Sequence, residues 1–285
     1  MASKKNSKWN DTWRRYRKNR IAMFGLVIVI LFLIIAIFAP LFVPYSSAVK
    51  LNARIRLQPP SMAHLFGTDE YGRDELARAV YGARMSLWLG LITTLVSSFL
   101  GCIFGAIAAF YGGKTDSIIM RIMDVFMCIP AILLALAIVA ALGPGDVNLI
   151  IAITVASVPP FTRIVRSVML TVVDQDYIES ARSYGASDSR LIFRYVLPNA
   201  IGPIIVQTTM SVAGMIIATA SLSFIGMGVQ PPTPEWGVML SNASQYMLTS
   251  PYLLFFPGIS IMLLALALNL VGDGLRDALD PRLKD

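Results

Sequence analysis

Six long apolar stretches constrain this chain more than any other feature of its sequence. Each is close to or above the roughly 20 residues that a helix needs to cross the hydrocarbon core of a bilayer. They cover residues 21–43, 87–111, 123–142, 147–165, 200–220 and 252–271. Only 14% of the residues are charged and 56% are hydrophobic, whereas a typical soluble domain has about 25% charged residues. The sequence therefore predicts an all-α, polytopic membrane protein with six transmembrane helices.

Lysine and arginine gather at one end of these spans. Of the 24 lysines and arginines, 18 lie in the N-terminal tail, in or next to the connections after the second and fourth spans, or at the C-terminal end. The other six lie between the first two spans. Because cytoplasmic connections are enriched in positive residues, we predict that both termini are cytoplasmic. The tails 1–20 and 272–285 are then cytoplasmic, and the connections 44–86 and 222–251 are extracytoplasmic.

The third and fourth spans carry features that predict local breaks and pairing. Pro130 lies inside the third span, and Pro159 and Pro160 lie late in the fourth. Proline removes a backbone N–H and clashes with the preceding turn, so we expect these helices to kink or end there. Arg121 and Asp124, spaced i and i+3, predict ion pairing at the cytoplasmic start of the third span, either within the helix or with another helix. The alternative is a gating pair.

A polar, helix-prone segment, residues 174–198, separates the fourth and fifth spans. Asp176 and Glu179 have the spacing of a capping box, which predicts a helix over residues 177–184. Gly185 follows, where a left-handed cap favours glycine. The pattern predicts a helical hairpin on the cytoplasmic surface, whose exposed carboxylate can accept hydrogen bonds from a partner. The alternative is a solvated connection that only links two spans.

The stretch ESARSYGASDSRLIFRYVLPN, which starts at Glu179, resembles the EAA loop of the membrane subunits of ATP-binding-cassette importers. The matching positions are Glu179, Ser180, Ala181, Gly185, Leu197 and Pro198. Ser180 replaces a usual alanine, and Tyr195 stands where an aliphatic residue is common. The resemblance implies that residues 174–198 form the coupling helix that docks onto an ATPase subunit. The residues then expected at this contact are Glu179, Ser180, Ala181, Gly185, Tyr177 and Tyr184.

Three more stretches indicate which type of importer subunit the chain resembles: FGTDEYGRDELARAVYGARMSL, QPPTPEWGVML and NLVGDGLRDALDPRLK. They resemble the C-type permease of dipeptide and oligopeptide importers, and the likeness runs from about Trp13 to the end. This implies a type I importer permease with a five-helix core at 87–271, in a bacterial plasma (inner) membrane. Such a subunit would translocate dipeptides or oligopeptides delivered by an extracytoplasmic binding protein. The alternatives are import of glutathione or chelated nickel by the same architecture, or a secondary carrier.

The resemblance also implies partners. No GxxxxGK[ST] phosphate loop is present, so ATP and Mg²⁺ are expected in partner ATPase subunits, and this chain is not itself an enzyme. We expect a second homologous permease subunit, two ATPase subunits, an extracytoplasmic substrate-binding protein and the lipid bilayer as partners, and no nucleic acid. The lone His64 lies in a polar loop, and Cys102 and Cys128 lie in apolar runs, so we predict no metal site and no directly bound cofactor.

Polar residues in the fifth span are candidates for the translocation path. Gln207, Thr208 and Ser211 are uncharged and lie at lipid depth. Such residues commonly bond to neighbouring helices, and the alternative is that they line the path. The spans carry no charged residue at mid-depth, which a secondary carrier would be expected to show.

A mixed acidic and basic cluster precedes the second span. Asp69, Arg73 and Asp74 belong to it, and a helix is expected to run from about Asp74 into the membrane. One interpretation is local ion pairs and caps that order this helix. The other is a surface on which the extracytoplasmic binding protein docks.

Overall fold

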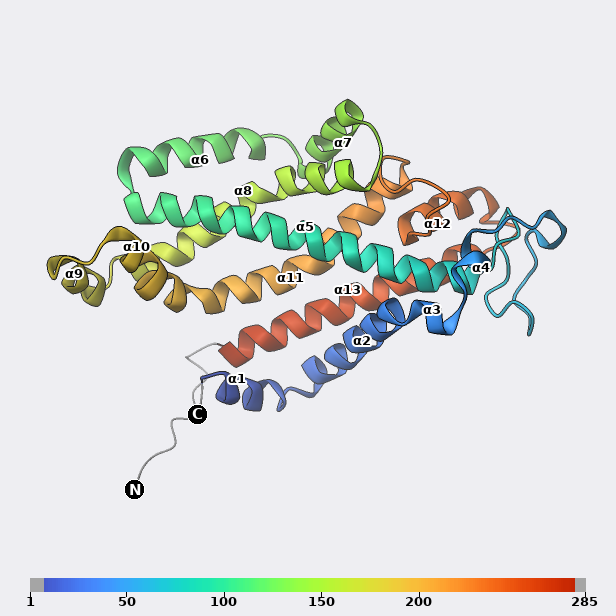
Figure 1. Ribbon diagram of the computed structural model, residues 1–285, viewed down its shortest axis with the longest axis horizontal. Coiled ribbons are helices and arrows are strands. Elements are labelled where there is room, and N and C mark those ends of the chain that lie inside the picture. The colour runs from blue at the N-terminus through green and yellow to red at the C-terminus, as the bar shows by residue number, and fades with distance from the viewer. Residues whose placement is uncertain (1–7, 280–285) are drawn as a thin grey trace, which may run out of the picture.

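The computed structural model describes residues 8–279, and within that range it contains helices and no named strand (Figure 1). Residues 1–7 of the predicted basic tail and residues 280–285 of the predicted C-terminal tail lie outside the described residues. Five helical stretches are long and apolar enough to cross a membrane, and a bent pair of helices makes a sixth if it counts as one span. The predicted all-α, polytopic fold class is thereby confirmed. The five are α2 (Arg20–Ile37), α5 (Glu75–Tyr111), α8 (Asp146–Val173), the stretch Asp188–Phe224 that ends in α11 (Leu197–Phe224), and α13 (Tyr252–Leu279).

Shorter helices complete the molecule and define its two ends. They are α1 (Lys8–Tyr16), α3 (Ala39–Phe42), α4 (Tyr45–Val49), α9 (Asp176–Ser183), α10 (Asp188–Arg190) and α12 (Trp236–Ala243). Figure 1 places α9 and α10 at one end of the bundle, which we call the hairpin end, and α4 and α12 at the other, which we call the α12 end. The helix α1 and the last turns of α13 lie toward the hairpin end.

The third apolar stretch is broken rather than straight. Helices α6 (Gly113–Met127) and α7 (Ala131–Leu142) meet at an angle of 83°. The break falls at Pro130, which has no N–H to continue the ladder of hydrogen bonds. The expected kink at Pro130 is confirmed. Because of it, α6 runs back beside α5 and α8, whereas α7 packs mainly on α8, with a smaller contact to α11 (Figure 1).

The fourth span behaves differently. The helix α8 continues through Pro159 and Pro160 to Val173. Of the two expected outcomes, an end of the helix at these prolines is wrong, and a kink stays a prediction. Neighbouring helices can compensate for the hydrogen bonds that proline removes from a span. Here α8 packs along α5 over much of its length, and the buried side chain of Phe161 follows the two prolines directly.

Two glycines let α5 and α8 approach closely. Gly101 and Gly105 are spaced four residues apart on α5 and both are buried. A Cβ atom on Gly101 would lie 2.5 Å from the Cβ of Phe161, and one on Gly105 would lie 2.7 Å from the carbonyl oxygen of Thr162. Small residues at this spacing are a common basis for helix packing in membranes. The core of the bundle therefore depends on the absence of side chains at these two positions.

Candidate functional site

The segment between α8 and α11 forms a helical hairpin. The helix α9 begins at Asp176 and has Gln175 as its N-cap, with no side-chain cap hydrogen bond. The predicted capping box of Asp176 and Glu179 therefore does not form, because the helix begins one residue earlier and places Asp176 in its first turn. There its charge still favours the positive end of the helix dipole. The second arm, α10, continues through a π-helical stretch, Leu191–Val196, into α11 without a break.

The turn between the two arms has the geometry that its glycine predicts. Gly185 has a φ of 80° and donates its N–H to the carbonyl oxygen of Arg182. Ala186 donates to the carbonyl oxygen of Ala181. These two bonds form a Schellman motif, which ends the helix α9 and satisfies its last carbonyls. The predicted left-handed cap is confirmed.

One face of the hairpin is fixed to the bundle. Ile178, Leu191 and Val196 are buried in a cluster with Phe110 at the end of α5 and Met169 near the end of α8. The guanidinium carbon of Arg182 lies 5.6 Å from the centre of the Phe110 ring. Burial of each aliphatic side chain contributes roughly 1.5–3 kcal/mol. The hairpin and the adjacent ends of α5, α8 and α11 therefore form one packed unit.

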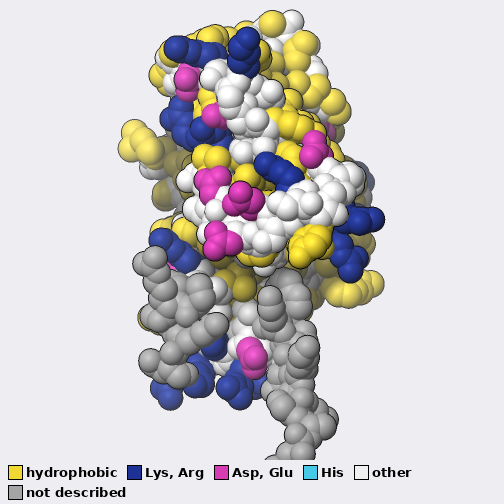
Figure 2. Space-filling model, turned by 90° about the vertical axis from the view of Figure 1, so that its left-hand side faces the viewer, with side chains coloured by type: hydrophobic (Ala, Val, Ile, Leu, Met, Phe, Trp, Pro, Cys, Tyr) yellow, Lys and Arg dark blue, Asp and Glu magenta, His cyan; other side chains and the backbone are white. Residues whose placement is uncertain are grey.

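The other face of the hairpin is exposed and carries large apolar side chains beside charged ones. Tyr184 is 93% exposed, Phe193 70% and Tyr177 43%. Glu179, Ser180 and Gly185 are exposed, and Ala181 is half-buried. Figure 2 views this end and shows acidic, basic and hydrophobic side chains close together on it. Exposed aromatic groups among polar ones are typical of a surface that binds a protein.

Phe193 is absent from the sequence-based set of candidates. That set consists of the matched positions and the two tyrosines. The signal that could have found it is local: Phe193 lies between Arg190 and Arg194, two residues after the buried Leu191, and so faces away from the bundle.

Two ion pairs connect α6 to α8. Asp124 receives a hydrogen bond of 2.6 Å from Nη2 of Arg163, and Asp116 receives two of 2.5 Å from Arg166. Of the two predicted arrangements, the pair between helices occurs at Asp124, because α8 lies beside α6 and offers it Arg163, and within the described residues Arg121 does not pair with Asp124. The bent helix α6 is thereby fixed along α8.

The polar residues of the fifth span bond within α11. The hydroxyl of Thr208 donates to the carbonyl oxygen of Ile204 at 2.9 Å. The hydroxyl of Ser211 donates to the carbonyl oxygen of Gln207 at 2.8 Å, and the amide of Gln207 donates to Ser211 Oγ at 3.3 Å. All three side chains are half-buried. All of these bonds lie within one helix, so they do not test whether the three side chains line the translocation path. That role of Gln207, Thr208 and Ser211 stays a prediction.

The acidic and basic cluster at the α12 end is mostly internal. Asp69 and Arg73 are 3% and 2% exposed, and Arg73 Nε lies 2.5 Å from a carboxylate oxygen of Asp69. Asp74 accepts the N–H of Ala77 at 2.9 Å, which caps α5, and its other oxygen lies 2.8 Å from Nδ1 of His64. This geometry favours local ion pairs and a cap as the role of these groups. Docking of a binding protein here stays a prediction.

A second internal acid, Glu235, was not among the sequence-based candidates. Its carboxylate is fully buried, accepts the N–H of Val238 at 3.0 Å as the N-cap of α12, and accepts the hydroxyl of Ser86 on α5 at 3.1 Å. The adjacent Trp236 donates its ring N–H to the carbonyl oxygen of Ala79. Burial raises the pKa of the Glu235 carboxyl, although its hydrogen bonds act in the opposite direction. The connection between α11 and α13 is thus fixed to α5.

Replacing Glu235 with glutamine is expected to raise stability at high pH and to change little at low pH. The folded-state pKa lies above the unfolded value of about 4.3, so the ionised carboxylate lowers the free energy of unfolding above the folded pKa. That loss disappears as the pH falls through the folded pKa toward 4.3. Melting temperatures of the two proteins in detergent, compared from about pH 8 to about pH 4, should converge as the pH falls. A difference that stays constant with pH would contradict this prediction.

Two segments of the chain match known protein families. Residues 101–285 match the family described as binding-protein-dependent transport system inner membrane component. Residues 7–60 match the N-terminal TM domain of oligopeptide transport permease C.

Individual relatives cover nearly the whole chain. The dipeptide transport system permease protein DppC of Alkalihalophilus pseudofirmus is 46% identical over 98% of this chain and 91% of the relative. The glutathione transport system permease protein GsiD of Escherichia coli is 45% identical over 97% of this chain and 91% of the relative. The di/tripeptide transport system permease protein DppC of Pseudomonas aeruginosa is 43% identical over 96% and 92%.

Solved structures show the same fold at low sequence identity. A chain of the inward-facing MetNI methionine ABC transporter aligns with a TM-score of 0.53 and 20% identity, and covers 68% of this chain and 94% of that one. A chain of an amino acid ABC transporter crystallised with histidines aligns with a TM-score of 0.53 and 18% identity, over 73% and 95%.

Proposed function

The chain belongs to the family of binding-protein-dependent transport system inner membrane components, and from this premise we propose that it imports dipeptides or oligopeptides as one permease subunit of an ATP-driven complex. An extracytoplasmic binding protein delivers the peptide, and two partner subunits hydrolyse ATP with Mg²⁺. A second homologous permease completes the path across a bacterial inner membrane. The observation that carries the proposal is the hairpin, which is packed on one face and presents Glu179, Tyr177 and Tyr184 on the other.

The ATPase subunit binds the exposed face of the hairpin and moves it. In this proposal the hairpin faces the cytoplasm, which agrees with the position of α1 and of the last turns of α13 toward the same end. Because Ile178 and Leu191 pack against α5 and α8, a displacement of the hairpin moves the ends of three spans together. The helix α11 then transmits the motion to Gln207, which lies roughly 15 Å along its axis from Leu197. Chemical energy released in the partner thereby changes which side of the membrane the path opens to.

Glutathione is the second candidate substrate. The specific observation in its favour is the 45% identity with the glutathione permease protein over almost the full chain, nearly equal to that with the dipeptide permease protein. A dipeptide and glutathione share a peptide bond and charged termini, so one path can accept both classes.

Uptake by the reconstituted complex tests the proposal. Proteoliposomes that contain the permease pair and the ATPase subunits, with binding protein outside and ATP inside, should accumulate a labelled dipeptide only when ATP is hydrolysed. Unlabelled dipeptide and glutathione, added as competitors in parallel, rank the two substrates. Uptake that follows an ion gradient in vesicles without nucleotide would favour a secondary carrier and would refute the proposal.

A further inference from the structure

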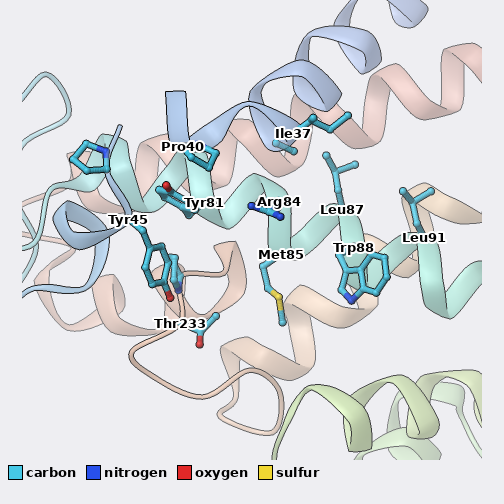
Figure 3. Close-up of a pocket in the computed structure, with 13 residues that line it drawn as sticks. Ile37, Pro40, Tyr45, Tyr81, Arg84, Met85, Leu87, Trp88, Leu91 and Thr233 are labelled. Carbon is cyan, nitrogen blue, oxygen red and sulfur yellow. The ribbon is translucent and has the colours of Figure 1, made fainter. Parts of the chain in front are cut away.

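An open groove of about 890 Å³ lies between the first span and α5 near the α12 end. One wall consists of Ile37 and Pro40 with Tyr45, and the other of the α5 residues Arg84, Trp88 and Leu91 (Figure 3). The loop residues Thr233 and Pro234 close it toward the α12 end. The lining is apolar except at the Arg84 end.

Arg84 is the charged residue of this groove, and it has no hydrogen bond or ion pair within residues 8–279. It is exposed to the groove. The two preceding arginines behave differently, since Arg73 and Arg78 are 2% exposed and lie within salt-bridge distance of Asp69. The groove therefore contains a cation without the counter-charge that its neighbours have.

The depth of Arg84 is set by its place on α5. It lies nine residues after Glu75, or roughly 14 Å along the helix axis, and three residues before Leu87, where the long apolar stretch begins. The ionic cluster around Asp69 marks the polar side of this boundary. Arg84 is thus placed where the headgroup region of a bilayer meets its hydrocarbon core. An arginine at such a depth requires an anionic partner or water.

The remaining lining residues continue from this cation toward the bilayer centre. Arg84, Trp88 and Leu91 are spaced four and three residues apart, so they lie on one face of α5, and Figure 3 shows them in that order with Tyr45 and Thr233 near the Arg84 side. Trp88 is 58% exposed and Ile37 64%. Aromatic rings such as those of Trp88 and Tyr45 favour the membrane interface. The surface therefore offers one anion-binding group at headgroup level and an apolar channel below it.

We propose that this groove binds an anionic phospholipid, with its phosphate on the guanidinium of Arg84 and one acyl chain along Trp88 and Leu91. A phosphate accepts two parallel N–H bonds from arginine, and a phospholipid carries the anion and the chain in one molecule. A helix of a second permease subunit would have to bring a carboxylate to the same depth, because otherwise it would bury Arg84 without a partner. The proposal depends on the membrane placement of α5 and on no part of the import mechanism.

Native mass spectrometry of the detergent-purified full chain, titrated with phosphatidylglycerol or phosphatidylcholine, tests the site. Arg84→Gln should weaken phosphatidylglycerol binding by about tenfold and weaken phosphatidylcholine binding clearly less, because the choline cation of that lipid offsets the charge of its phosphate. Arg84→Lys, which keeps the charge but cannot donate two parallel N–H bonds, should have an affinity between those of the unmodified chain and Arg84→Gln. The matched control is Arg54→Gln, at an exposed arginine of the same end that does not line the groove, and it should bind both lipids as the unmodified chain does.

A photo-crosslinking residue at position 88 in the assembled complex shows which of the two candidate occupants, the phospholipid or the second permease subunit, lies in the groove. Capture of phosphatidylglycerol at this position supports the proposal, whereas capture of the second permease subunit overturns it. Equal phosphatidylglycerol binding by the unmodified chain and by Arg84→Gln, with matching melting temperatures, also overturns it.

Discussion

Replacing Glu179 with lysine is expected to reduce ATP-dependent uptake on the order of 100-fold while the protein stays folded. The carboxylate is exposed on α9 beside Ser180 and has no partner among the described residues, so its reversal removes no internal contact. In the proposed complex, however, it lies in the interface with the ATPase subunit. Truncating or reversing one member of a charged interface pair commonly costs 2–5 kcal/mol of binding free energy. Uptake and ATP hydrolysis, measured on the same proteoliposomes, should separate because hydrolysis no longer drives the permease.

Asp188→Lys is the matched control for this substitution. Asp188 is an exposed acid in the same hairpin, at the start of α10, and lies outside the six expected contact residues. Its reversal should change uptake by no more than about twofold, since an exposed charge outside an interface has a small effect. Normal transport by the Glu179→Lys protein would show that the coupling role assigned to this residue is wrong. Equal loss in both variants would show that the net charge of the hairpin matters, and not this position.

Replacing Gly105 with alanine is expected to lower the free energy of unfolding by about 1–3 kcal/mol, the usual effect of forcing extra atoms into a packed core. The added Cβ would lie 2.7 Å from the carbonyl oxygen of Thr162 and 2.9 Å from the backbone nitrogen of Arg166. Both are backbone atoms of α8, so neither can move aside as a flexible side chain could. The helices α5 and α8 would have to separate along their shared surface. Unfolding in a graded series of detergent mixtures, followed by circular dichroism, measures the loss.

Gly214→Ala tests the same chemical change where space is available. Gly214 lies inside α11, and a Cβ built on it has no atom of another part of the described structure within 4 Å. Alanine favours a helix over glycine by up to about 1 kcal/mol, so this variant should be as stable as the unmodified protein or more so. Opposite signs at positions 105 and 214 are therefore expected. A Gly105→Ala protein as stable as the Gly214→Ala protein would refute the close contact.

The sequence predicted features that depend on local chemistry. The apolar stretches, the kink at Pro130 and the left-handed turn at Gly185 each follow from one residue type or from one short run, and the structure confirms them. The start of α5 after its cap residue Asp74 also follows from local chemistry. The resemblance to dipeptide-type permeases of ATP-binding-cassette importers rested on three motifs and is confirmed by the family matches and relatives.

Features that depend on tertiary packing could not be predicted. The helix α8 continues past Pro159, where α5 packs along it, and the partner of Asp124 is Arg163 of α8. The burial of Glu235 required knowledge that α12 packs on α5. A charged residue in a connecting segment looks solvated in the sequence, whereas the fold places it in the interior.

The uninterrupted helical stretch from Asp188 to Phe224 has a mechanical consequence. Its 37 residues span roughly 55 Å, from the surface that Glu179 shares to the α12 end. A rod of that length turns a small angular displacement into a large linear one, so a tilt of about 10° at one end would carry the far end by about 10 Å. In the proposed complex, a small tilt of the hairpin, in which Leu191 is packed, would in this way become a large displacement of the opposite end of α11.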